Sequence, residues 1–113
     1  MHAVIAWWDL AGSPQTVESL REFLREEAVG RYAAVPGLRL KFWISDRAAG
    51  RWGAVFLWES AESAERAAVE LPPRAAELIG GPPAVRLAFD VEATVEGVFE
   101  AAALGGRGLL WEG

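Results

Sequence analysis

The chain has 113 residues, of which 52% are hydrophobic, and its formal net charge at pH 7 is −5. This length suits a single domain, and the negative charge disfavours a nucleic-acid partner. Because the chain has no cysteine, it has neither disulfides nor a zinc–thiolate site. No apolar run is long enough for a membrane span, and the N-terminus lacks the pattern of a signal peptide, so we expect a cytoplasmic protein that binds no membrane.

The first half of the chain predicts a strand, a helix and a hairpin. Residues 3–8 (AVIAWW) are apolar without interruption, which indicates a strand buried on both faces. Ser13 followed by Pro14 predicts a helix start, and that helix should end between residues 30 and 34. Residues 38–45 (LRLKFWIS) alternate like a strand with one wet face, and 53–58 (GAVFLW) return as an apolar partner strand.

The second half predicts two helices, a strand and a tail. Ser60 is placed to cap an alanine-rich helix that stops at Pro72-Pro73, and residues 74–79 add a short helical stretch. Residues 84–91 (AVRLAFDV) alternate again and predict a fourth strand. We divide the chain into a domain over 1–95 and a C-terminal tail over 96–113, whose apolar end LLW should dock on its own or a partner subunit.

The predicted order β-α-β-β-α-β is that of the ferredoxin-like split βαβ fold, an α+β architecture with a four-stranded antiparallel sheet. In this topology the strands lie in the order 4-1-3-2. The two runs without alternation then fall on the central strands, and the two alternating runs fall on the edges. This agreement between pattern and topology supports the fold assignment.

Both helices of this fold cover one face of the sheet and leave the other face open. We place four charged residues and one tryptophan on the open face: Arg39, Lys41, Arg86, Asp90 and Trp43. The apolar residues of the central strands would also be exposed there, and a second copy of the sheet is the simplest cover for them. We therefore expect a homodimer in which two sheets pack face to face, which would make a dimeric α/β barrel.

Three segments, PGLRLKFW, WGAVFLWESAESAERA and AFDV, resemble the YdhR-type mono-oxygenases of the dimeric α/β-barrel superfamily, which are related to the antibiotic-biosynthesis mono-oxygenases. The resemblance covers most of residues 36–92. The following residues match its pattern: Pro36, Gly37, Lys41, Trp43, Gly53, Leu57, Ser63, Ala64, Phe89, Asp90 and Val91. It implies oxygenation of a small aromatic or polyketide-like substrate without metal, flavin or haem. Related proteins use tryptophan, asparagine, tyrosine or histidine for this chemistry, whereas this chain has no asparagine, one tyrosine and one histidine.

Aromatic residues on the predicted strands have two interpretations. They fill the core and the dimer interface, or they line an apolar pocket for a flat aromatic ligand. The residues that we select as candidates for substrate binding are Trp7, Trp8, Phe56, Trp58 and Phe89.

Four residues are candidates for catalysis: Lys41, Trp43, Arg86 and Asp90. Lys41 or Arg86 would stabilise an enolate or phenolate, and Asp90 or Asp9 would serve as the base. The alternatives are an ion-pair network for the basic residues and strand-end caps for the acidic ones. We expect no metal and no haem, because His2 is the only histidine in the chain.

Three functions fit these observations. The first is a cofactor-independent mono-oxygenase. The second is a non-oxidative cyclase or isomerase with the same fold, which would use the pocket to position an enol. The third is a dimer that binds a small apolar ligand and catalyses nothing. A closed pocket that contains a shielded lysine or acid would favour an enzyme, and a pocket filled by the protein's own tryptophans would favour a structural or binding role.

Overall fold

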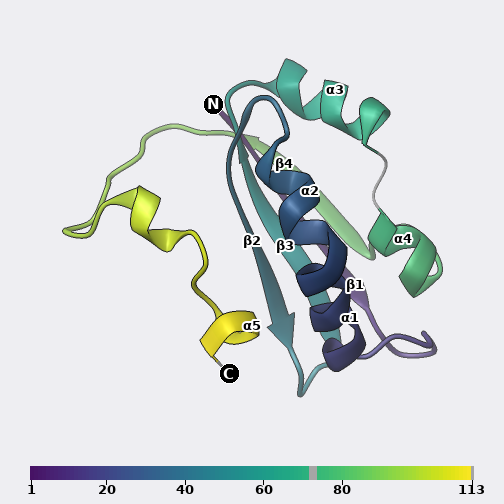
Figure 1. The fold of residues 1–113 in the computed structure, drawn as a ribbon. Coiled ribbons are helices and arrows are strands. Elements are labelled where there is room, and N and C mark those ends of the chain that lie inside the picture. Colours follow the sequence, from purple (N-terminus) through teal and green to yellow (C-terminus); the bar gives the residue numbers. More distant parts are fainter. Residues whose placement is uncertain (72–73, 113) are drawn as a thin grey trace.

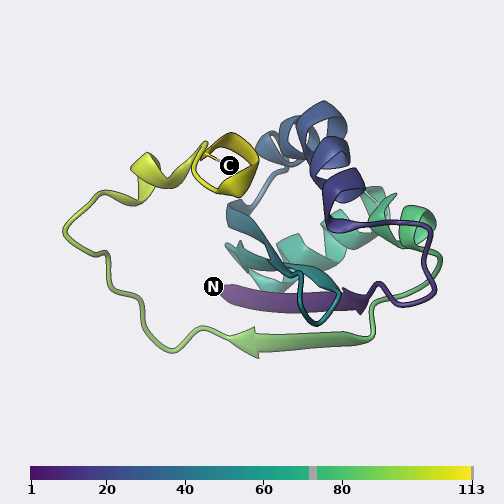
Figure 2. The ribbon, with the colours of Figure 1, turned by 90° about the horizontal axis from the view of Figure 1, so that it is seen from below.

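A computed structural model of the chain, which describes residues 1–71 and 74–112, has an antiparallel sheet with helices on one face (Figures 1 and 2). The order of the strands is β2-β3-β1-β4, so the predicted α+β ferredoxin-like topology and the central position of both uninterrupted apolar runs are confirmed. The bounds of the strands are His2–Asp9 (β1), Leu38–Asp46 (β2), Arg51–Trp58 (β3) and Val85–Asp90 (β4).

The first helical segment begins three residues later than predicted. Its N-cap is Thr16, whose side chain accepts a hydrogen bond from the N–H of Ser19 (3.1 Å) while the Ser19 hydroxyl accepts one from the N–H of Thr16 (2.9 Å). Ser13, the expected cap, instead donates its hydroxyl to the carbonyl of Ile79 (2.9 Å). The segment consists of α1 (Val17–Phe23), a π-helical turn η1 (Leu24–Ala28) and α2 (Val29–Ala33).

The two helices that follow β3 agree with prediction. Helix α3 (Ala61–Glu70) is capped by Ser60, which accepts a hydrogen bond from the N–H of Ser63 (3.1 Å), and α4 (Arg74–Ile79) has the predicted bounds. The predicted helix break at Pro72-Pro73 lies outside the described residues. No helix within the described part of the chain has the length and apolar character needed to cross a bilayer.

The tail leaves the sheet after β4 and forms two short helical pieces, the 3₁₀ turn η2 (Ala101–Leu104) and α5 (Leu109–Glu112). Figures 1 and 2 show α5 beyond the outer strand β2, on the side of the first helical segment. Leu110 packs there against the main core cluster, which includes Leu20 and Trp52, while Val95 and Val98 remain almost fully exposed.

The helix-facing side of the sheet differs from the expectation. On β1 the buried residues are Val4, Ala6 and Trp8. Register places Arg86 opposite Ala6 and Asp90 opposite His2, in phase with these residues. Arg86 and Asp90 therefore belong to the face that carries the helices, and their assignment to the open face is wrong.

Strand β2 shows the same reversal. Lys41 pairs with Phe56, and Trp43 pairs with Ala54, which is buried under the helices. Lys41 and Trp43 therefore also face the helices, contrary to prediction. Arg39 lies at a register irregularity at the start of β2 and is exposed, paired with Glu59 (3.1 Å). Alternation determines which residues share a face, but it does not determine which face the helices cover.

The opposite face of the sheet is apolar and accessible. Phe42 and Ile44 on β2 are 47% and 37% exposed, and Leu87 and Phe89 on β4 are 43% and 49% exposed. This face, which we call the open face, holds more large apolar side chains than the sequence prediction gave it, because both edge strands present their apolar sides to it.

Candidate functional site

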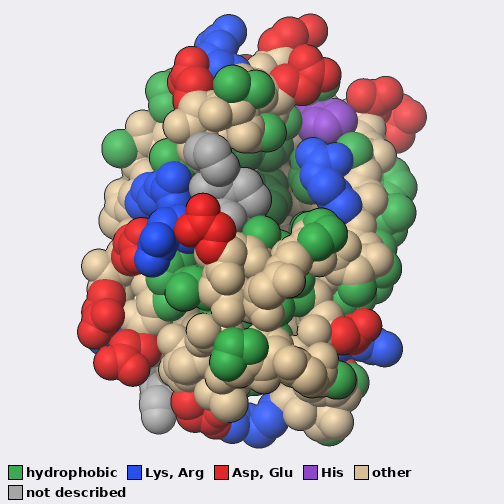
Figure 3. Space-filling model, turned by 90° about the vertical axis from the view of Figure 1, so that its right-hand side faces the viewer, with side chains coloured by type: hydrophobic (Ala, Val, Ile, Leu, Met, Phe, Trp, Pro, Cys, Tyr) green, Lys and Arg blue, Asp and Glu red, His purple; other side chains and the backbone are tan. Residues whose placement is uncertain are grey.

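A cavity of about 180 Å³ lies between the sheet and the helices. Its floor is formed by the inward-facing residues of the sheet, and its walls come from α2, α3 and α4. Figure 3 shows hydrophobic side chains gathered in a recess on the side that carries α3 and α4, with basic groups on either side of it. Lining side chains include Val4, Trp8, Tyr32, Lys41, Trp43, Trp52, Phe56, Trp58, Ala64, Ala67 and Leu71.

Three aromatic rings surround the amine of Lys41. Its Nζ lies 3.2 Å from the centre of the Tyr32 ring, 4.2 Å from that of Phe56 and 4.5 Å from that of Trp43. The Tyr32 ring meets the rings of Trp43 and Phe56 edge to face, with centroids 6.0 and 6.1 Å apart. These four residues, which we call the lysine cage, come from β2, β3 and α2.

The lysine cage strongly favours the neutral form of its amine. Burial, reinforced by the positive charge of Arg31, lowers the pKa of Lys41 to about 6. The ring faces are the main compensation for lost hydration of the ammonium, because no carboxylate belongs to the cavity lining within the described residues. Burial also raises the pKa of Tyr32, and Arg31 partly opposes this rise. At neutral pH the cage therefore holds a free amine next to a protonated phenol.

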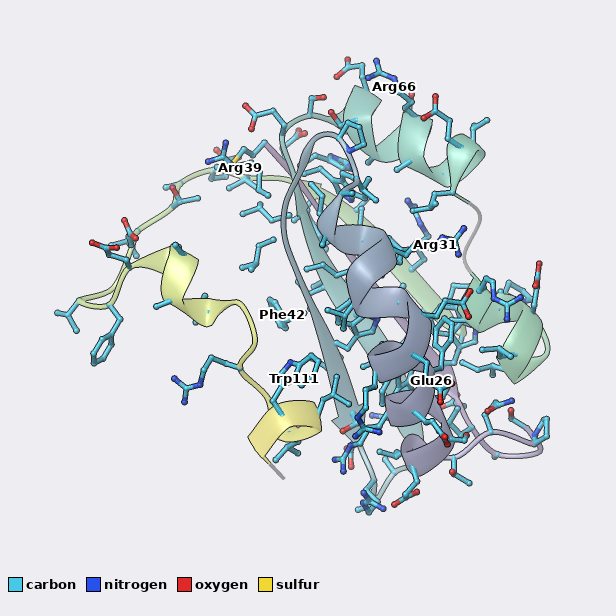
Figure 4. The ribbon with its side chains drawn as sticks, in the orientation of Figure 1. Glu26, Arg31, Arg39, Phe42, Arg66 and Trp111 are labelled. Atoms are coloured by element: carbon cyan, nitrogen blue, oxygen red, sulfur yellow. The ribbon has the colours of Figure 1, made fainter. Side chains whose placement is uncertain are left out.

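The remaining charged residues of the lining are all basic: Arg31, Arg74 and Arg86. Arg74 forms ion pairs with Glu27 (2.8 Å) and Glu77 (3.6 Å). Figure 4 shows Arg31 projecting from α2 toward the side of α3 and α4, whereas Arg39 points away from the cavity. Arg86 forms no ion pair within the described part of the chain and so presents a cation to the cavity of a protein whose net charge is −5, which favours an anionic ligand.

Small side chains keep the cavity open. Ala64, Ala67 and Ala68 of α3 and Ala75 of α4 face it, so the helices supply little volume. Trp8 is held in place at one end because its indole N–H donates to the carbonyl of Gly81 (2.9 Å). Phe56 and Trp58 stack with centroids 5.9 Å apart and planes at 10°, which gives a flat apolar surface suited to a planar ligand.

The cavity brings together six of the nine residues selected from the sequence: Lys41, Trp43, Arg86, Trp8, Phe56 and Trp58. Trp7 pairs with Gly53 and Phe89 with Ala3, and both project from the open face. Asp90 is exposed and does not belong to the lining.

Sequence reasoning missed Tyr32, Arg31 and Trp52. Tyr32 was identifiable in principle, because it follows Ala28 by one helical turn on the buried face of the first helical segment. In the described part of the chain, no group of three His, Cys, Asp or Glu side chains is placed so that it could bind a metal ion.

Comparison with known proteins identifies structural neighbours only. No family model matches the sequence, and no curated protein matches it. Among solved structures, a Nitrosomonas europaea protein of unknown function, NE2512, is similar over 84% of this chain and 92% of its own, with 17% identity and a TM-score of 0.63. The ActVA-Orf6 mono-oxygenase of Streptomyces coelicolor, solved with nanaomycin D, is similar over 84% and 90%, with 18% identity and a TM-score of 0.60.

A third neighbour is SnoaB, a cofactor-independent oxygenase from Streptomyces nogalater, with 15% identity and a TM-score of 0.58 over 83% of this chain and 95% of its own. The chain therefore has the ferredoxin-like fold of the antibiotic-biosynthesis mono-oxygenases. At these identities the likeness establishes the fold alone.

Proposed function

We propose that this protein is a cofactor-independent mono-oxygenase that acts on a small aromatic or polyketide-like substrate in the cavity beneath its helices. One observation carries the proposal: three aromatic rings enclose the amine of Lys41 in an apolar cavity, where burial lowers its pKa to about 6. Its neighbours in fold include two oxygenases, and the YdhR-type resemblance covers Lys41 and Trp43 themselves.

The first step is proton transfer to Lys41. A phenol or enol hydroxyl gives its proton to the free amine, and the resulting ammonium lies on the faces of Tyr32, Phe56 and Trp43. The amine and the substrate thus become an ion pair in a site of low polarity, where each charge stabilises the other strongly. From the sequence we expected Asp90 or Asp9 to be the base, but neither residue lines the cavity. We therefore assign this role to Lys41.

Oxygenation then uses the electrons of the substrate anion. The anion passes one electron to dioxygen, and the superoxide formed joins the substrate radical at carbon. The peroxide that results loses water and leaves a carbonyl. Overall a CH₂ group becomes C=O, one oxygen atom stays on carbon, and the other leaves as water with the two hydrogens. Trp43, Phe56 and Trp58 would orient the planar substrate.

The proposed assembly is a homodimer formed through the open face. Phe42, Ile44, Leu87 and Phe89 would be covered by the same residues of a second copy, as in other face-to-face sheet packings. The cavity lies on the opposite side of each sheet, so each subunit would carry its own site.

Oxygen uptake tests the activity. We expect chelator-treated protein to consume oxygen above the spontaneous rate with at least one member of a panel of single-ring enolisable ketones that carry a CH₂ group beside the carbonyl, which match the size of the cavity. Lys41→Met should lower kcat by about 10²- to 10⁴-fold, the usual contribution of a general base, and Trp43→Phe should weaken ligand binding. Arg39→Met, on the same strand but outside the cavity, is the matched control.

Two results would contradict the proposal. Quenching of tryptophan fluorescence by a ligand without oxygen uptake would identify a binding protein. Conversion of the ligand to an isomer or cyclised product under nitrogen would identify a non-oxidative enzyme.

A further inference from the structure

Lys41 is the only lysine in the chain. The other ten basic residues counted with it are arginines, whose guanidinium groups do not lose their protons in proteins. The one side chain that can become a neutral amine is therefore the one enclosed by the rings of Tyr32, Phe56 and Trp43. Arginine at this position would keep its charge and would be no nucleophile.

The surroundings of the amine leave its lone pair available. Among the described residues, no carboxylate lies within ion-pair distance of Nζ, and the charged groups that line the same cavity are the guanidinium groups of Arg31, Arg74 and Arg86. Burial and Arg31 together lower the pKa of Lys41 to about 6. A lysine that is desolvated and placed beside another cation is the arrangement that activates amines for attack on carbonyl groups.

We propose that Lys41 forms a reversible imine with the aldehyde or ketone group of a single-ring aromatic carboxylate bound in the cavity. The Nζ lone pair forms a C–N bond at the carbonyl carbon, and the oxygen becomes a hydroxyl. That hydroxyl then leaves as water, which carries away both hydrogens of the amine, and the C=N bond is completed. No oxidant or reductant is consumed. The step needs the cavity but not dioxygen, so it does not depend on the proposed oxygenation.

The choice of ligand follows from volume and charge. A cavity of about 180 Å³ is similar in size to apolar cavities that hold one benzene ring. The stacked rings of Phe56 and Trp58 present a flat surface to such a ligand. Arg86 lines the cavity and forms no ion pair within the described residues, so a carboxylate on the ring would be attracted to Arg86 while the carbonyl meets the amine.

Reductive trapping tests the proposal. The full chain is incubated under nitrogen with 4-formylbenzoate and cyanoborohydride, which fixes an imine as a stable amine, and the adduct is located by peptide mass mapping. We expect an adduct at Lys41, formed at a rate that is already constant by pH 8, in addition to the adduct that any exposed N-terminal amine gives at Met1. Benzaldehyde, which lacks the carboxylate, should react at least about fivefold more slowly if binding supplies the difference, since about 1 kcal/mol corresponds to that factor.

Two variants make the outcome specific. Arg39→Lys adds an exposed amine two residues away, whose rate at pH 7 should be at least about tenfold lower and should still rise between pH 8 and 10, as expected of an ordinary lysine. Lys41→Met, which should fold at least as stably as wild type because it removes a buried amine, should lose the adduct, with only the N-terminal amine of Met1 still reacting.

Equal rates at Lys41 and at the amine introduced by Arg39→Lys would overturn the proposal, and so would an adduct at Met1 alone. Trapping under nitrogen is also separable from the oxygen assay, because an adduct at Lys41 would stand even if no substrate supported oxygen uptake.

Discussion

Gly53 lies directly opposite Trp7 in the pairing of the two central strands, and a Cβ added to Gly53 would come 2.7 Å from the Cβ of Trp7. The same methyl group would also collide with the carbonyl oxygen of Ala6, which belongs to the backbone of the strand. Glycine is therefore needed at this position for close approach rather than for an unusual backbone angle, because only a hydrogen fits against the backbone of β1 and the Cβ of Trp7.

Gly53→Ala should destabilise the protein by about 1–3 kcal/mol, the usual cost of forcing a methyl group into a packed site. Chemical denaturation monitored by tryptophan fluorescence gives this value. Gly30→Ala is the control, because Gly30 lies in α2 with no heavy atom within 4 Å of the added Cβ; it should be neutral or stabilise by up to about 1 kcal/mol. Equal melting temperatures for the two variants would contradict the packing described for Trp7.

Lys41 should give the protein a specific dependence of stability on pH. In the unfolded chain its pKa is near 10.5, and in the folded protein it is about 6. Between these values the unfolded state binds one proton more than the folded state. The destabilisation caused by this group is therefore complete below pH 6 and disappears as the pH rises toward 10. Lys41→Met should therefore stabilise the protein, and the gain should be largest near pH 6 and shrink toward pH 10.

Thermal unfolding of wild type and Lys41→Met at several pH values between 5 and 10 measures this difference. Arg39→Met serves as the control, since Arg39 is exposed and should show a difference that does not change across this range. A pH-independent difference for Lys41→Met would mean that the amine keeps its charge in the folded protein.

The open face should control association. We expect Phe42→Asp and Phe89→Asp to convert a dimer into a monomer at micromolar concentration, because each buries a charge at the proposed interface. Val69→Asp, at an exposed apolar position of α3, should leave the dimer intact. Sedimentation velocity distinguishes the two masses, and a monomeric wild-type protein would refute the assembly.

The tail should contribute to stability through Leu110. Leu110 packs against the core cluster that includes Trp52, so Leu110→Ser should lower the melting temperature by a few degrees. Val98→Ser changes a residue of the same tail that is 97% exposed, and its melting curve should match that of wild type. If the two variants melt alike, the tail adds nothing through α5.

The order of the sheet followed from the sequence because the pattern of each strand reflects how many of its faces are buried. Residues 53–58 contain no polar side chain, which required a central position, and residues 38–45 alternate as edge strands do. The face of the sheet on which the Lys41 side chain lies could not be predicted in this way. A charged residue on an edge strand satisfies alternation equally well on either face, and only the aromatic groups of α2 and β3 explain why it points inward.

Helix boundaries show a similar limit. Ser13 and Thr16 are both acceptable caps by residue type, and the choice between them depends on Ile79, a residue 66 positions away that engages the Ser13 hydroxyl. Tyr32 was overlooked because its contribution to the site depends on Lys41, and each residue taken alone has an ordinary structural role.

The alanines that line the cavity leave space in the protein interior, and this space lowers the stability of the ligand-free protein. A compact domain of this size gains stability by filling its interior, and Ala67 on α3 leaves space where a leucine would touch the rings. Ala67→Leu should raise the melting temperature of the ligand-free protein and abolish quenching by aromatic ligands, whereas Ala33→Leu, on the exposed side of α2, should do neither. The space that admits a ligand therefore lowers the stability of the ligand-free protein. Each substitution that fills the cavity should raise the melting temperature and reduce ligand binding together.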